Sequence, residues 1–199
     1  MFYVTGLALV AGAVIGLATG GRLRFLGRHR LRAWWLVMVG FGLQLATDHL
    51  KVGGLGTAMV LAGAGALLAF AALNPTLVGI GVVAVGVAAN ALVIGLNDGM
   101  PVRPNSVVAA HIATRDEEPS LDYGYRHHAE GPSDKLRMLG DIIALPQFHE
   151  VVSFGDLILA LGVAATIAHL LRPGARHAAR DPPPDPTAAR PSPPDPGGG

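Results

Sequence analysis

The chain has 199 residues and a mean hydropathy of +0.44, with only 15% of its residues charged. The formal net charge is +1, and the absence of cysteine excludes disulfides, thiolate metal ligands and thiol catalysis. Four stretches contain no Asp, Glu, Lys or Arg: residues 2–21, 33–47, 52–97 and 157–168. Because a soluble helix of such length needs a charged face towards water, these stretches predict an integral membrane protein.

The apolar stretches are long enough for five membrane-crossing helices, since a hydrocarbon core about 30 Å thick needs about 20 helical residues. The stretch 52–97 holds two of them, and Asn74-Pro75-Thr76 divides it because proline cannot donate a backbone hydrogen bond. We therefore predict an all-α membrane protein with five spans, at about residues 2–21, 33–49, 55–73, 77–96 and 153–171.

Basic residues follow the first span rather than precede it: Arg22, Arg24, Arg28, Arg30 and Arg32. A signal peptide has the opposite order, so we expect an uncleaved span. Because basic loops stay in the cytoplasm, we expect the N-terminus outside and the C-terminus inside. The loop 97–152 then lies outside, and its five Lys or Arg against nine Asp or Glu agree with that side.

The chain divides into a membrane domain, residues 1–171, and a tail, residues 172–199. From Asp181 onward the tail has eight prolines, three glycines and no aromatic residue. Such a composition buries too little apolar surface to offset the entropy of ordering, so we expect a disordered cytoplasmic tail.

Glycines recur every four residues in the first span, at Gly12, Gly16 and Gly20. Small residues on one face allow two membrane helices to approach closely. We favour packing within one bundle, and a homo-oligomer through this face is the alternative.

Two amides lie deep in the predicted spans, Gln44 and Asn90. An amide in hydrocarbon is costly without a partner, so each is expected to bond to a neighbouring helix or to contact a substrate. The spans contain no deep carboxylate, Lys or Arg, which argues against an ion-coupled pump.

The outer loop contains two local signals. Asn97-Asp98-Gly99-Met100-Pro101-Val102 is a turn signature, in which Gly99 can adopt a positive φ. Residues 134–145 place Leu136, Leu139 and Ile143 at helical spacing after Ser133, a plausible N-cap. We predict a short amphipathic helix there, lying on the membrane surface or over the bundle.

The last span opens with Ser153-Phe154-Gly155-Asp156. A serine with an acid three residues later matches a capping box, and the acid also complements the helix dipole. We interpret Asp156 as structural, with a catalytic or ligand-binding role as the alternative.

Histidines and acids of the outer side offer possible metal ligands: His49, His111, His127, His128 and His149, with Asp98 and Asp141. Their spacing matches no metal motif, and there is no hydrolase or phosphate-binding motif either. We therefore predict no metal, no cofactor and no catalytic residue, and nothing in the sequence indicates nucleic-acid binding.

Three segments resemble a bacterial multi-pass membrane family of unknown function: 89–102, Leu139-Gly140-Asp141-Ile142-Ile143-Ala144-Leu145-Pro146, and 152–156. The family's Asn-Gly-Gly before Met-Pro is replaced here by Asn97-Asp98-Gly99. The resemblance covers about residues 1–171; it implies a bacterial inner-membrane location and no known activity.

The matching residues define a candidate site at the outer surface, provided that Asn90 faces the bundle interior: Asn90, Asn97, Asp98, Gly99, Met100, Pro101, Asp141, Pro146 and Asp156. The favoured function is a non-enzymatic module that binds a lipid, peptide or protein partner there. A small transporter or channel subunit, and a membrane enzyme acting on a lipid-linked substrate, are the alternatives.

Overall fold

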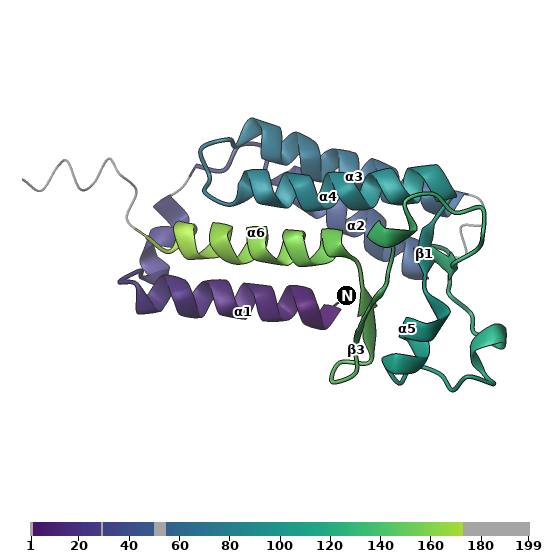
Figure 1. Cartoon of the computed structure of the whole chain (residues 1–199). Helices are drawn as coiled ribbons and strands as arrows, with labels where there is room; N and C mark the ends of the chain where they lie inside the picture. Colours follow the sequence, from purple (N-terminus) through teal and green to yellow (C-terminus); the bar gives the residue numbers. More distant parts are fainter. Residues whose placement is uncertain (1, 29, 50–54, 173–199) are drawn as a thin grey trace, which may run out of the picture.

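The computed structural model describes residues 2–28, 30–49 and 55–172, and the predicted tail beyond residue 172 lies outside them. Within these residues, five long helices run lengthwise through the molecule (Figure 1). They are α1 (Phe2–Ala18), α2 (Trp35–His49), α3 (Gly56–Leu73), α4 (Ile80–Asn97) and α6 (Phe154–Leu170). Helix α6 packs against α1 and α4, and α3 packs against α4 and α2, so the neighbours run α1, α6, α4, α3, α2.

The helices differ in length and hydropathy. By length and composition, α3 and α4 are each long and apolar enough to cross a membrane, whereas α1, α2 and α6 are apolar but shorter. The fold is thus mostly helical, with two helices of membrane-crossing length.

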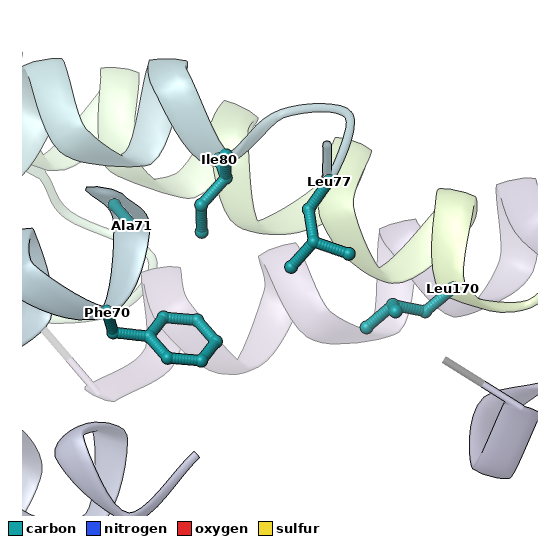
Figure 2. Close-up of a cluster of buried hydrophobic side chains, with 5 residues drawn as sticks. All are labelled: Phe70, Ala71, Leu77, Ile80 and Leu170. Atoms are coloured by element: carbon teal, nitrogen blue, oxygen red, sulfur yellow. The ribbon is translucent and has the colours of Figure 1, made fainter. Parts of the chain in front are cut away.

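One end of the bundle holds the segment between α1 and α2 and the turn between α3 and α4. There, a short 3₁₀ helix (η1, Leu23–Arg28) follows α1, and Asn74 ends α3. The Asn74 amide donates to the carbonyls of Arg32 and Phe70 and accepts from the Arg32 N–H, which ties the segment before α2 to this turn. A buried apolar cluster closes this end (Figure 2): Phe70, Ala71, Leu77, Ile80 and Leu170.

The opposite end holds residues 98–153, which we call the loop domain (Figure 1). Its elements are β1 (Met100–Val102), α5 (Pro104–Ala109), η3 (Glu118–Ser120), β2 (His127–Ala129), η4 (Arg137–Leu139), β3 (Ile143–Leu145) and β4 (Glu150–Val152). Strand β1 pairs with β2 in parallel, with Met100 opposite His127, and β3 pairs with β4 as an antiparallel hairpin.

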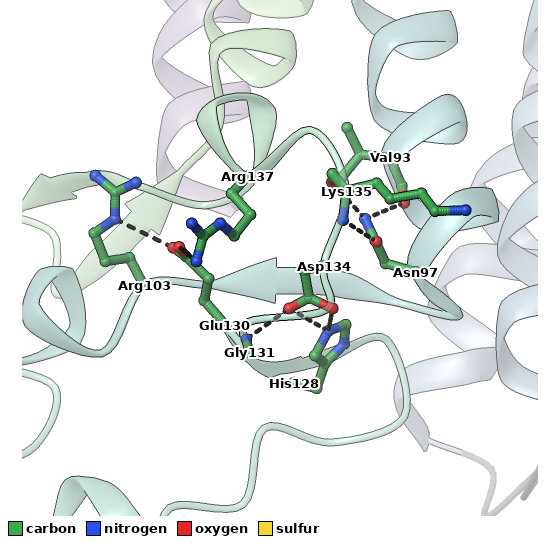
Figure 3. Close-up of polar contacts among 9 residues, drawn as sticks. All are labelled: Val93, Asn97, Arg103, His128, Glu130, Gly131, Asp134, Lys135 and Arg137. Carbon is green, nitrogen blue, oxygen red and sulfur yellow. Dashed lines mark hydrogen bonds and ion pairs between the residues drawn. The ribbon is translucent and has the colours of Figure 1, made fainter.

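Charged side chains hold the loop domain together (Figure 3). Glu130 pairs with Arg103 at 3.2 Å and with Arg137 at 3.5 Å. His128 pairs with Asp134 at 3.2 Å. These contacts connect the strand layer to the segment that leads into η4.

The predicted helical fold is confirmed in part, because the described residues are mostly helical. The loop domain adds two small sheets that the sequence did not predict. The predicted amphipathic helix over 134–145 is wrong, as is its N-cap at Ser133. Leu136 has a left-handed φ of 54°, which breaks the helical path, and only Arg137–Leu139 form a short 3₁₀ turn. Ile143–Leu145 instead pair with β4, so backbone bonding to a hairpin partner outweighs the local periodicity. The short α-helix of this loop is α5.

Two local predictions at the helix ends are confirmed. Gly99 has a φ of 146° after α4, and Asp98 before it is left-handed at 55°. At the start of α6, the Asp156 N–H donates to Ser153 Oγ and the Ser153 N–H donates to Asp156 Oδ2, and the donor–acceptor distance is 3.0 Å in both hydrogen bonds. This is the reciprocal capping box expected from the sequence.

Glycines of α1 allow the close approach of α6. A methyl group on Gly12 would lie 2.5 Å from the Ala164 carbonyl, and one on Gly16 would meet Leu171. Gly20 lies beyond the helix in a left-handed turn, with no atom near the position of a β-carbon. Gly12 and Gly16 therefore pack against α6 within the chain, as the favoured interpretation of the sequence predicts.

Candidate functional site

A cavity of about 400 Å³ lies between the long helices and the loop domain. Its helical wall is mostly apolar, with residues contributed by α2, α3, α4 and α6: Phe41, Leu45, Val60, Ala64, Leu67, Val87, Ile94, Leu159 and Val163. The helices also contribute Thr5 and Gln44, and most of the polar lining lies at the end nearest the loop domain: Asn90, Arg126, His127, Asp141, His149, Glu150 and Asp156. The cavity is therefore amphipathic along its length.

Asn90 connects α4 to the cap of α6. Its Nδ2 donates to Asp156 Oδ1 at a distance of 2.7 Å, and Ser153 Oγ donates to Asn90 Oδ1 at a distance of 3.0 Å. Gly155 allows this contact, because a β-carbon there would collide with the Asn90 side chain. Asp156 thus completes the capping box and also lines the cavity, so its structural role leaves its carboxylate beside the site.

Asp141 is held in place through its backbone. Its N–H donates to the Pro101 carbonyl and its carbonyl accepts from the Arg103 N–H, each at a distance of 2.9 Å. These backbone bonds connect Asp141 to β1. The residue is only 6% exposed. Its Oδ2 lies 3.6 Å from His127 Nε2, and its Oδ1 is buried with no hydrogen-bond partner among the described residues.

The electrostatics of this pair favour neutral side chains. Burial raises the pKa of the Asp141 carboxyl, and the nearby negative charge of Asp156 raises it further. Burial lowers the pKa of the His127 imidazole to about 4, helped by the positive charge of Arg126. Both groups lie beside an apolar cavity where ionic charge is costly.

The structure brings four of the predicted site residues together in the cavity lining: Asn90, Met100, Asp141 and Asp156. Pro101 is buried behind them and holds Asp141 through its carbonyl. The remaining four lie elsewhere. Gly99 and exposed Asp98 form the turn after α4, and Pro146 belongs to the β3–β4 connection.

Asn97 contacts the loop domain (Figure 3) and does not line the cavity. Its side chain donates to the Val93 and Lys135 carbonyls and accepts from the Lys135 N–H. Asn97 therefore anchors the loop domain on the end of α4.

Six polar lining residues are absent from the predicted site set: Thr5, Gln44, Arg126, His127, His149 and Glu150. The sequence marks Gln44 only as a deep amide, and His127 and His149 only as metal-ligand candidates. The last four come from two loop segments, around residues 126–127 and 149–150, and no local spacing marks them. Within the described ranges, no group of three or more His, Asp or Glu is arranged to hold a metal ion.

The fold and the site define a mostly helical protein with an amphipathic cavity closed at one end by a loop domain. The chain belongs to a family of unknown function, DUF5317, whose model matches residues 28–168. Comparisons with functionally curated proteins and with solved structures found no match.

Proposed function

We propose that this protein is a five-span membrane protein that binds an amphipathic, lipid-like ligand in the cavity. The apolar part of the ligand lies among the helices, and its head group lies among the polar side chains beneath the loop domain. The observation that carries this proposal is the gradient along one cavity, from Leu67 and Val163 to Asp141 and Arg126. A lipid has the same gradient along its length.

The outer surface of the bundle supports a membrane setting. Large apolar side chains on different helices face outwards, including Leu7 on α1, Val85 on α4 and Leu161 on α6. Such a surface is costly in water and favourable in lipid. Helices α1, α2 and α6 are short for a span, so flanking residues complete the crossing.

The distribution of charge supports the orientation. Arg22, Arg24 and Arg172 belong to the same end as the exposed Trp34 and Trp35, opposite the acidic loop domain. Basic residues favour the cytoplasmic side, and tryptophan favours the headgroup level. The loop domain and the polar end of the cavity then face outwards, in a bacterial inner membrane, and the ligand comes from the outer leaflet.

The test is retention of lipid by a variant in which the cavity is filled. Ala91 lines the cavity, whereas Ala88, one turn away on the same helix, is exposed. We expect Ala91→Phe to abolish the lipid adducts seen by native mass spectrometry after gentle extraction. Ala88→Phe adds the same volume outside the cavity and should keep them.

Comparable unfolding temperatures of the two variants in detergent show that both are folded. Lipid adducts equally abundant in Ala91→Phe and Ala88→Phe, or a wild-type protein without adducts, would overturn the proposal.

A further inference from the structure

We propose that the cavity selects a ligand whose head group carries a primary ammonium, bound between Asp141 and His127. This inference rests on the proposed function and names the chemistry that the polar end recognises. The shared chemistry has two possible sources, the ethanolamine head of a phospholipid and a free lipophilic amine.

The acceptors of the polar end are unequally satisfied. Asp156 is occupied within the protein, since its Oδ1 accepts from Asn90 and its Oδ2 accepts from the Ser153 N–H. Asp141 Oδ1 is buried and has no such donor among the described residues. A buried acceptor without a partner is costly, so a ligand donor at this atom would add a hydrogen bond without displacing one within the protein.

The neighbouring imidazole of His127 offers a second hydrogen-bond acceptor to the same ligand donor. His127 Nε2 and Asp141 Oδ2 lie 3.6 Å apart, beyond hydrogen-bonding distance. In the neutral imidazole, one ring nitrogen is an acceptor, and His127 also bonds to the Tyr123 backbone. An ammonium group has three N–H donors and no acceptor, so it can satisfy both the carboxylate and the imidazole.

The charge of the lining selects a cation over an anion. Among the described lining residues, the carboxyl groups of Asp141, Glu150 and Asp156 stand against the single guanidinium of Arg126. A phosphate head alone would add negative charge to this set, and a hydroxyl would bring no compensating charge. A cation beside Asp141 would offset the burial and the like charge that raise the pKa of its carboxyl.

The experiment compares amphiphiles that share a tail and differ in the head. The purified full chain, held in a neutral maltoside detergent, is titrated with dodecylamine, dodecyltrimethylammonium and dodecyl phosphate, and binding is measured by calorimetry. We expect dodecylamine to bind at least about tenfold more tightly than the other two, because only its head is both cationic and a hydrogen-bond donor. This comparison uses wild-type protein and needs no variant to fold.

Variants then assign the preference to one carboxyl. Asp141→Asn should lower dodecylamine affinity by about tenfold or more, because it removes the carboxyl that can ionise beside the bound ammonium. Asp116→Asn removes a carboxyl from an exposed position of the loop domain and should bind as wild type does. Equal binding of the three amphiphiles, or equal affinity in wild type and a folded Asp141→Asn, would overturn the inference.

Nanodiscs separate the two sources of the ammonium. Retention of phosphatidylethanolamine over phosphatidylglycerol in native mass spectra supports the phospholipid, whereas dodecylamine binding without that preference supports a free amine. Lipid adducts that show no preference for any head group, without selective dodecylamine binding, would overturn this inference but not the proposed function. Complete absence of adducts would end the proposed function itself.

Discussion

Single residues at the polar end of the cavity combine a structural role with a place in the cavity lining. Asp156 caps α6 and yet lines the cavity, and Asn90 links that cap to α4. The cap was predictable because a capping box is local, with its two partners three residues apart. The pairing of Asp141 with His127 was not, because the two residues belong to separate loop segments joined through β1.

His127 should make stability depend on pH. Its folded-state pKa of about 4 lies below the ordinary 6.5, so the unfolded chain takes up the proton first as pH falls. The stabilisation from the neutral ring is therefore complete above about pH 6.5 and is lost as pH falls towards 4. We expect His127→Gln to flatten the decline in unfolding temperature over this range, measured in detergent.

The raised pKa of Asp141 has the opposite effect on stability, because it stabilises the folded chain as pH falls. Asp141 is present in both wild type and His127→Gln, so the difference between their curves reports the contribution of His127. The control His111→Gln changes an exposed ring and should follow the wild-type curve. A His127→Gln curve parallel to that of wild type would contradict the assignment.

Among the elements, the long helices and the loop segments behaved differently. The five helices coincide with the apolar stretches to within a few residues, because each stretch is longer than several helical turns and has no competing periodicity. Residues 134–145 are shorter, and their apolar side chains suit both a helix and a strand. Leu139 packs against the cluster of Val60, Val93, Ile94 and Met100, while Ile143–Leu145 join a hairpin.

The α1–α6 contact should be sensitive to a single methyl group. Gly12→Ala would place a β-carbon 2.5 Å from the Ala164 carbonyl, so the helices must separate. We expect a loss of about 1–3 kcal/mol in the free energy of unfolding, the usual cost of overpacking. Reversible unfolding in mixed detergent measures it.

Gly6→Ala is the matched control on the same helix, because no atom lies within 4 Å of its β-carbon position. The control should match or exceed wild-type stability, since alanine favours helix over glycine. If Gly12→Ala were as stable as Gly6→Ala and instead changed the oligomeric state, the face would serve contacts between chains.

At the scale of the whole molecule, the two ends of the bundle should lie on opposite sides of the membrane. The chain has no native cysteine, so introduced ones report without background. Ser120 is exposed in the loop domain, and Thr76 is exposed in the turn between α3 and α4 at the other end. We expect Ser120→Cys to react with an impermeant maleimide on intact cells and Thr76→Cys to react only after permeabilisation. The reverse pattern would invert the orientation.

The amino-acid sequence alone determined the helical framework, because hydropathy over 15 to 20 residues and a local capping box depend on nearby residues only. It also named Asn90, Met100, Asp141 and Asp156 as candidate site residues, and the structure brings these four together in the lining of one cavity. Only the tertiary structure decided that Asn97 and Pro146 lie outside the cavity, that 134–145 is not a helix, and that Arg126 and His127 line the cavity. Those outcomes depend on pairing between segments such as β1 and β2, about 25 residues apart, where backbone bonding and burial outweigh local preference.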